Sequence, residues 1–317
     1  MPDKNNLNPI NSIQLFALNK YFVDLVRLFK INKFPKVLLL SGEKGIGKFT
    51  LSFHLVNYAL SQNSEKPYNY EEQKINKESS TYKQILSNTC QNYNYIGNED
   101  QKKTSIEDIR NIKRKFNTSL LNNMPRFIIF DDVELLNINA ANSLLKFIEE
   151  PSTSNYFILI NNKKQNVIET IKSRALETKI FLKDSEKNQI FQNLLISHNI
   201  EKHFSHEFKK YTTPGKLIQY SESLKKLDIN SSTSFYDTAQ ILFDSYKKTK
   251  NQIFLDCINF FLEIKFSTKK NLETQEFLKS VNAKKNLMKL LYNYKKFNLT
   301  NNSVLEYIKN SQEHYAQ

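Results

Sequence analysis

Cysteine and glycine are scarce in this sequence, and long apolar runs are missing. The 317 residues include two cysteines and five glycines. Cys90 and Cys257 are too few and too far apart for a disulfide framework or a four-cysteine zinc site. No run of about eighteen apolar residues occurs, so the sequence predicts no membrane-spanning helix. Residues 1–7 are polar and lack the apolar core of a secretory signal, and we therefore expect a cytoplasmic protein with no membrane partner.

Positive charge exceeds negative charge by a wide margin. With 46 Lys and Arg against 32 Asp and Glu, the formal net charge is +14. Such a balance favours anionic partners, above all nucleic acid. The many Lys, Asn and Ile residues and the few Gly residues also fit a biased genomic composition, and no arginine-rich recognition helix is visible. The charge alone leaves a DNA-binding surface and compositional drift both open.

The first 180 residues alternate between short apolar runs and helical patterns. The runs are bounded by turn residues, which is typical of buried parallel strands. Between them apolar side chains recur at helical spacing, as at Phe22, Leu25, Val26 and Phe29. The sequence therefore predicts an α/β unit with a parallel sheet. Its strands are expected at residues 37–40, 127–130 and 157–160, and its helices at residues 7–34, 51–59, 105–121 and 139–150.

Two other regions have a different character. Residues 61–104 are polar, and we expect part of this stretch to be a flexible surface insertion with a short strand at Tyr93–Ile96. After residue 181 strand signals end, and helical spacing of apolar residues continues to the end of the sequence. We expect three domains, at residues 1–180, 181–224 and 225–317.

A glycine-rich loop follows the first predicted strand and precedes a predicted helix. Its sequence GEKGIGK fits the phosphate-binding pattern G-x-x-x-x-G-K, in which backbone amides and the helix N-terminus hold phosphates. The next residue is Phe49, where a Ser or Thr hydroxyl normally binds Mg²⁺, and Thr50 lies about 100° further around the helix. The loop is compatible with ATP, whereas Mg²⁺ ligation is expected to be weakened or lost. The candidate nucleotide-binding residues here are Gly42, Gly45, Gly47, Lys48 and Thr50.

Two carboxylates end the second predicted strand. Asp131 and Asp132 follow an apolar run, as in a Walker B motif, in which the first carboxylate helps to hold Mg²⁺. The second position normally carries a Glu that polarises the attacking water. Asp132 is one methylene shorter, roughly 1.5 Å less reach, and misplacement by about 1 Å can lower a rate by roughly two orders of magnitude. We favour a degenerate Walker B motif over the alternative that the pair only opens a turn.

Four further segments resemble the AAA+ subunits of bacterial clamp loaders. Residues 140–151, AANSLLKFIEEP, resemble the AANALLKxLEEP helix of those ATPases, and residues 170–175, TIKSRA, resemble their TIxSRC motif. Residues 105–110 are similar to the segment before their Walker B strand. Residues 213–217, TPGKL, are similar to a lid segment of their non-motor subunit. The order and spacing of these segments agree over residues 10–220.

The resemblance implies an architecture and a set of partners. It implies an AAA+, RecA-like P-loop domain over residues 1–180, a helical lid over residues 181–224 and an all-α collar over residues 225–317. Members of this family form a hetero-pentameric ring on their collars, in which motor (gamma/tau) and delta subunits join a non-motor stator. The ring belongs to DNA polymerase III and loads the sliding clamp onto primer–template DNA.

The resemblance also gives Arg174 a role. The arginine of the SRC motif in the stator points into the ATP site of the adjacent motor subunit. A guanidinium delivered across an interface neutralises charge on the γ-phosphate, as an arginine finger in trans. By this resemblance Ser173 would position the loop, and Ala175 replaces the cysteine of the motif. We favour the finger over a plain surface arginine because of the surrounding motif.

Three further expectations come from the same resemblance. Asn161 or Asn162 follows the third strand at the sensor position, where an amide could bond a γ-phosphate or the attacking water. Lys216 lies near the lid position of a nucleotide-sensing arginine, and a phosphate contact there is left open. Many relatives carry a four-cysteine zinc module in the region corresponding to residues 66–98. Here that region has only Cys90, so we predict no zinc site.

Two functions therefore compete. In the first, the chain is a stator that donates Arg174, with little or no ATPase activity of its own. Phe49 and Asp132 favour this interpretation. In the second, it is an active motor subunit of the gamma/tau type, which the intact Lys48 and Asp131 favour. We favour the stator, because the hydroxyl after Lys48 and the Glu after Asp131 are both replaced.

Overall fold

The computed structural model describes residues 9–97, 104–116, 124–197, 211–230, 232–267, 274–297 and 300–313. The chain divides into two compact units, Met1–Leu194 and Leu195–Gln317, each treated separately below. The boundary falls within helix α7 (Asp184–Ser197). The separation of the second unit into a lid and a collar stays a prediction. No described helix has the length and apolar character needed to cross a bilayer.

In the described part of the first unit, five parallel strands form one sheet in the order β2-β3-β4-β1-β5. The predicted α/β unit with a parallel sheet is confirmed. The three apolar runs became the central strands, which are buried on both faces. The strands are β1 (Val37–Ser41), β2 (Tyr93–Ile96), β3 (Arg126–Phe130), β4 (Asn155–Asn161) and β5 (Leu176–Lys179).

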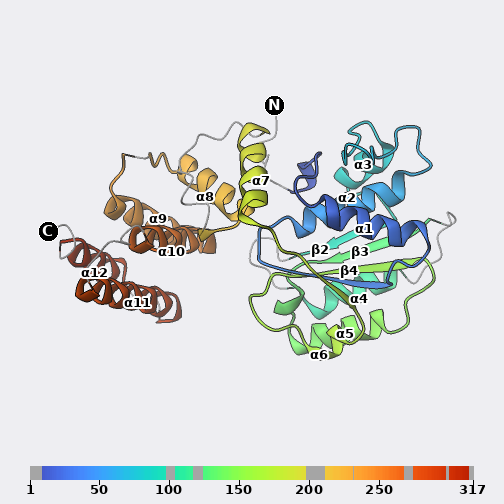
Figure 1. Cartoon of the computed structure of the whole chain (residues 1–317). Helices are drawn as coiled ribbons and strands as arrows, with labels where there is room; N and C mark the ends of the chain where they lie inside the picture. The colour runs from blue at the N-terminus through green and yellow to red at the C-terminus, as the bar shows by residue number, and fades with distance from the viewer. Residues whose placement is uncertain are drawn as a thin grey trace. The chain divides into compact units, whose positions relative to one another are not determined.

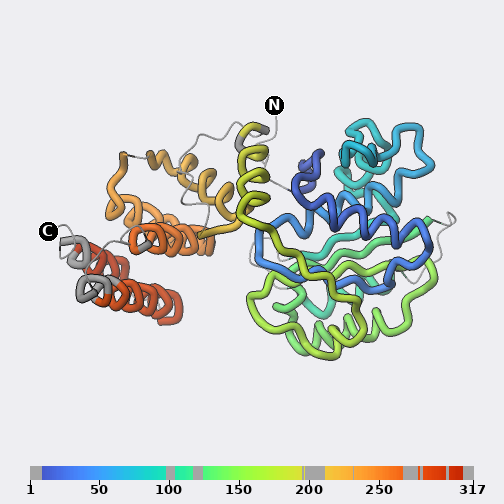
Figure 2. Tube along the Cα trace, in the orientation of Figure 1, coloured from blue at the N-terminus to red at the C-terminus, as the bar shows by residue number. Residues whose placement is uncertain are grey.

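Side chains of the central strands alternate between two hydrophobic cores, one on each face of the sheet. Leu38 and Leu40 of β1 belong to the core under the first group of helices, and Leu39 to the core under the second. The two groups lie on opposite faces of the sheet (Figure 1), and their traces are separated in the same way in Figure 2. The first group is α1 (Asn19–Lys30), α2 (Lys48–Ser61) and α3 (Ser80–Leu86); the second is α4 (Ile106–Phe116), α5 (Ile138–Ile148) and α6 (Glu169–Lys172).

Two of these helices begin at side-chain caps. Ser105 and Asp108 cap α4 reciprocally: the Ser105 backbone N–H donates to Asp108 Oδ2 at 2.8 Å, and the Asp108 N–H donates to Ser105 Oγ at 3.2 Å. The helix expected from residue 105 thus begins at this cap, while residues 117–121 of the expected helix lie outside the described residues. Asn137 caps α5, its Oδ1 accepting from the Ala140 N–H at 2.8 Å.

Part of the polar stretch after α2 packs against that helix. Residues 98–103 of the expected insertion lie outside the described residues, and its flexibility stays a prediction. Tyr68 and Tyr82 are each 6% exposed, as part of the same core as α2. His54 of α2 binds this stretch, with Nδ1 2.8 Å from the Tyr68 hydroxyl and Nε2 2.9 Å from the Ser12 carbonyl oxygen. Since Nε2–H donates to a carbonyl, Nδ1 accepts from Tyr68. Burial lowers the pKa of His54 to about 4, so the ring is neutral.

Every regular element in the described residues of the second unit is a helix, as predicted. Helix α9 packs against α10 and α12, and α10 packs against α8 and α11. Phe243 of α9 is fully buried, and its ring meets Tyr294 of α11 edge-on at a centroid distance of 5.0 Å. The helices are α8 (Pro214–Lys226), α9 (Phe235–Thr249), α10 (Gln252–Ser267), α11 (Thr274–Phe297) and α12 (Asn301–Glu313).

Candidate functional site

Most of the predicted site residues gather at one end of the strands, the edge of the sheet at which the strands finish. The glycine-rich loop follows β1, the pair Asp131–Asp132 follows β3, and Asn161–Asn162 ends and follows β4. These strands are parallel neighbours, so their carboxyl ends meet at the same edge. This edge of an open parallel sheet is where such folds bind ligands.

The glycine-rich loop is closed around its own lysine. Gly45 and Gly47 have φ of 89° and 93°, a left-handed conformation that lets the loop turn into α2. Lys48, the first residue of α2, is 3% exposed, and its Nζ donates to the carbonyls of Gly42 at 2.9 Å and Glu43 at 2.6 Å. Burial lowers the pKa of Lys48 to about 8, against the opposing pull of Asp131 and the carboxylates beside it. The lysine is thus hydrogen-bonded by the loop in which it would hold a phosphate.

Asp132 is surrounded by positive charge. Its carboxylate lies 3.1 Å from Lys164 Nζ and 3.6 Å from Lys44 Nζ, and it accepts from Asn162 Nδ2 at 2.8 Å. Burial alone would raise the pKa of Asp132, but Lys44, Asn162 and Lys164 outweigh it and hold the pKa below its usual value. The carboxylate at the position of a water-polarising Glu is therefore ionised and engaged by two lysines.

Asp131 is satisfied by neutral donors. Its Oδ1 accepts from Asn162 Nδ2 at 2.9 Å and from the Asp132 backbone N–H at 2.8 Å, while its Oδ2 accepts from the Tyr95 hydroxyl at 3.3 Å. Burial, followed by the charge of Asp132, raises the pKa of Asp131. Asn162 bridges both carboxylates.

The two sensor candidates are placed differently. Asn161 turns to the other side, where its Nδ2 donates to Ser41 Oγ at 3.2 Å and its Oδ1 accepts from the Lys163 N–H at 2.8 Å. Asn162 is the one whose amide reaches the Walker B carboxylates. The role of either amide toward a nucleotide stays a prediction.

Tyr95 and Glu134 belong to this site although no sequence pattern pointed to them. Glu134 is 3% exposed, its two carboxylate oxygens each accept from the Asn162 backbone N–H at 3.2 Å, and burial raises its pKa. Tyr95 reaches Asp131 from β2, the strand beside β3. The only signal for Glu134 was a charged residue in the turn directly after the Walker B pair.

Phe49 decides how the site fits a metal. Its ring is stacked on Phe53 at 6.0 Å and meets the Tyr95 ring edge-on at 4.9 Å. A phenyl ring offers no ligand, and Thr50 lies half-buried at the next position of α2. The glycine loop and Lys48 fit a nucleotide phosphate, whereas these residues do not fit Mg²⁺ in the manner of a P-loop. Within the described ranges, no group of three or more His, Cys, Asp and Glu residues could hold a metal ion.

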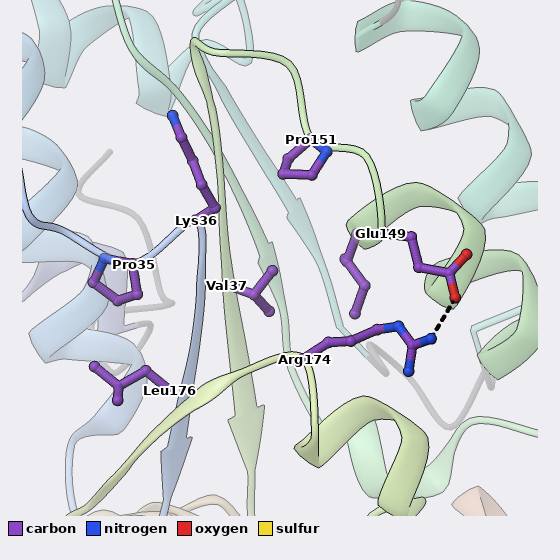
Figure 3. A pocket seen from close by; sticks show the side chains of 8 residues that line it. Pro35, Lys36, Val37, Glu149, Pro151, Arg174 and Leu176 are labelled. Carbon is purple, nitrogen blue, oxygen red and sulfur yellow. Dashed lines mark ion pairs between the residues drawn. The ribbon is translucent and has the colours of Figure 1, made fainter.

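Arg174 lies at the opposite edge of the sheet. It is in the turn between α6 and β5, just before Leu176, which pairs with Leu38 near the start of β1. The loop with Lys48 follows the other end of β1, so the strand's five residues, at about 3.3 Å each, lie between the two. Arg174 Nη2 is 2.8 Å from Glu149 Oε1 (Figure 3). Both side chains line a pocket of about 490 Å³, whose other lining residues are Pro35, Lys36, Val37, Ile148, Pro151 and Leu176.

Lys216 belongs to the second unit, apart from the other site candidates in the sequence. It lies in the first turn of α8. Its contact with a phosphate therefore stays a prediction.

The sequence of this chain is similar to those of known proteins. A family model described as DNA polymerase III, delta subunit, matches residues 18–184. The DNA polymerase III subunit delta′ of Buchnera aphidicola subsp. Baizongia pistaciae is 28% identical over 152 residues, 46% of this chain and 44% of that protein. The subunit gamma of Buchnera aphidicola subsp. Schizaphis graminum is 26% identical over 238 residues, 74% of this chain and 58% of that protein. The matched region thus spans about half the length of these relatives.

One solved structure matches this chain at low sequence identity. A DNA polymerase III gamma subunit-related protein from Thermotoga maritima is 17% identical with a TM-score of 0.47, covering 89% of this chain and 96% of that chain. Because the family model matches more than half of the 317 residues, the chain belongs to the DNA polymerase III delta subunit family.

Proposed function

We propose that this chain is the delta′ subunit of a DNA polymerase III clamp loader and acts there as a stator. In this role it joins motor (gamma/tau) and delta subunits in a cytoplasmic hetero-pentameric ring that loads the sliding clamp onto primer–template DNA. Its lid and collar, over residues 181–224 and 225–317, hold the ring together. Membership of the delta subunit family and the delta′ relative support this assignment over a general P-loop protein.

The observation that carries the proposal is the separation of Arg174 from the chain's own phosphate loop. The two lie at opposite edges of one sheet. An arginine finger works only within hydrogen-bonding reach of the γ-phosphate. Arg174 therefore serves a nucleotide held by another subunit, where its planar guanidinium neutralises the charge that develops during hydrolysis.

The chain's own loop supports a weak or absent ATPase activity. Phe49 supplies no hydroxyl for Mg²⁺. The Asp132 carboxylate is paired with Lys44 and Lys164, so it is not available to polarise an attacking water. Lys48 and the loop amides are compatible with ATP once Lys48 leaves the carbonyls of Gly42 and Glu43. ATP is thus a candidate ligand, and turnover is assigned to the neighbour.

The alternative is an active motor subunit of the gamma/tau type. The complete glycine loop with Lys48 and the carboxylate of Asp131 favour it, as does the long match to a gamma subunit. In that case Lys48 would bind ATP for hydrolysis in this chain, and Arg174 would be secondary.

Steady-state ATP hydrolysis by the reconstituted loader, with clamp and primed DNA, separates the two. For a stator, Arg174→Ala lowers turnover strongly, since an arginine finger is worth about 10³–10⁵ in the rate of the one site that it serves. Arg174→Lys does not restore the rate, because lysine lacks the bidentate geometry. Lys48→Ala leaves turnover nearly unchanged. Lys172→Ala is the matched control, a partly exposed cation two residues away that pairs with Glu169.

The motor alternative predicts the reverse. Lys48→Ala then removes much of the turnover, and the isolated chain hydrolyses ATP alone. Either result would contradict the stator assignment.

A further inference from the structure

We infer that the Mg²⁺ position of this chain's phosphate loop is filled by its own side chains: the Tyr95 hydroxyl, held in place by Phe49, takes the place of a cation at Asp131. A nucleotide phosphate that enters this loop is consequently bound without a divalent ion. The inference concerns only the chain's own loop and does not depend on Arg174, so the stator assignment and this inference stand or fall separately.

The first observation is a chain of contacts from α2 to the Walker B strand. Phe49 occupies the position of the Mg²⁺-binding hydroxyl and meets the Tyr95 ring edge-on at 4.9 Å. The Tyr95 hydroxyl in turn donates to Asp131 Oδ2 at 3.3 Å. Tyr95 therefore links the two changes: it contacts Phe49, which replaces one metal ligand, and it occupies an oxygen of Asp131, the other ligand.

The second observation is the space left for the tyrosine at Gly97. A Cβ atom at this position would lie 2.1 Å from the Tyr95 hydroxyl oxygen and 2.5 Å from the ring carbon that bears it. Such distances are far inside van der Waals contact, so the tip of Tyr95 lies directly over the Gly97 backbone. A glycine two residues after Tyr95 is what permits the ring to turn toward Asp131.

The third observation is that both carboxylates of the site already have partners. Asp132 has Lys44 and Lys164, and Asp131 has three neutral donors, from Asn162, the Asp132 backbone and Tyr95. Mg²⁺ requires near-octahedral oxygen ligands and gives up its water reluctantly. Here it would have to displace the Tyr95 hydroxyl from Asp131 and still find no oxygen on Phe49.

The test is Mn²⁺ binding by the full-length chain in the presence of ATP, followed by electron paramagnetic resonance. Four proteins are compared: wild type, Phe49→Thr, Tyr95→Phe and the double variant. Only the double variant both supplies a hydroxyl and frees Asp131, so it alone should gain bound Mn²⁺, by about tenfold or more over wild type. Asp131→Asn added to the double variant should abolish the gain.

A matched control separates this site from a general loosening of α2. Tyr82 also packs edge-on against Phe53 of α2, at 6.3 Å, but its hydroxyl lies 3.5 Å from the Ile10 carbonyl oxygen, away from the carboxylates. Tyr82→Phe combined with Phe49→Thr should therefore gain no Mn²⁺. Circular dichroism establishes that each variant is folded.

The inference is overturned if a folded double variant binds no more Mn²⁺ than wild type, or if its gain survives Asp131→Asn. A measurement on wild type decides the matter should the double variant fail to fold. A fluorescent ATP analogue should bind with the same affinity in Mg²⁺ and in EDTA, and a failure to bind in either condition contradicts the inference. An affinity that rises about tenfold with Mg²⁺ and is lost in Asp131→Asn contradicts the inference.

Discussion

Arg174 and Glu149 form an ion pair in which Nη2 lies 2.8 Å from Oε1, at the edge of the sheet away from the phosphate loop (Figure 3). Arg174 also donates from Nη1 to the Thr170 carbonyl at 3.1 Å. The side chains of the pair are 39% and 43% exposed, so water screens their attraction. The guanidinium is thus held in a set direction by bonds that a phosphate could replace.

This exposure predicts little effect on folding when the pair is broken. Arg174→Ala and Glu149→Gln should each lower the free energy of unfolding by less than about 1 kcal/mol, the usual upper value for an exposed pair. Urea denaturation followed by circular dichroism measures this. A loss of several kcal/mol would mean that Arg174 is a structural residue, and that reduced ATPase activity in Arg174→Ala reflects unfolding.

The buried His54 predicts that stability depends on pH. In the unfolded chain its pKa is near the ordinary 6.5, whereas burial lowers it to about 4 in the folded protein. Between these values the unfolded chain binds a proton that the folded chain does not. The free energy of unfolding therefore falls as the pH is lowered from 6.5 to about 4, by roughly 3 kcal/mol from this group.

The variant His54→Gln isolates that contribution, since glutamine can bond Ser12 and Tyr68 without titrating. Denaturant unfolding is measured for both proteins at several pH values across the window. The wild-type curve should fall more steeply on acidification than that of His54→Gln. Parallel curves would show that His54 does not take part in the pH dependence.

The cap of α5 predicts a local loss of stability. Asn137→Ala removes the acceptor of the Ala140 N–H and should cost about 1 kcal/mol. Asn139→Ala changes the same residue type at an exposed position inside the helix, where alanine is the better helix former, and should be neutral or slightly stabilising. Chemical denaturation compares the two variants, and equal effects would contradict the capping role.

The core of the second unit predicts a contrast between two phenylalanines. Phe243 is fully buried against Tyr294, and Phe297 at the end of α11 is 61% exposed. Phe243→Ala should cost about 3–5 kcal/mol through lost burial and a cavity. Phe297→Ala should change stability by less than about 0.5 kcal/mol. Thermal or urea unfolding of the full chain measures both, and a similar loss in the two variants would place the core of this unit elsewhere.

The sequence predicted the three central strands and the edge strand β2, but it contained no signal for the other edge strand, β5. Strands β1, β3 and β4 are apolar because helices cover both of their faces. Strand β5 has the sequence Leu-Glu-Thr-Lys, in which three of the four residues are exposed, and it pairs with β1 on one side. Its hydrogen bonds come from tertiary structure rather than from any hydrophobic pattern. The packing of residues 61–97 was missed for a similar reason, since buried tyrosines such as Tyr68 keep the stretch polar in composition.

In the candidate site, the sequence predicted those residues that belong to short motifs along the chain. The loop with Lys48 and the pair Asp131–Asp132 are such residues, and the structure brings them to one edge of the sheet. Tyr95 is also there because it lies in β2 beside β3, and Lys164 is there because it follows β4. Contacts of this kind depend on strand order, and nothing along the chain specifies that β2 lies next to β3.

Because Arg174 and Lys48 lie at opposite edges, the arginine and the phosphate loop of the first unit face different neighbours. In a contact related by a two-fold axis, both copies present the same patch to each other. Such a contact cannot bring the arginine of one copy to the phosphate loop of the other, because the two lie on different patches. Only a head-to-tail contact does so, and head-to-tail contacts run in one rotational sense. In the stator role proposed above, the chain gives an arginine and needs none, so it would occupy one end of such a head-to-tail series, with its own phosphate loop serving no neighbour.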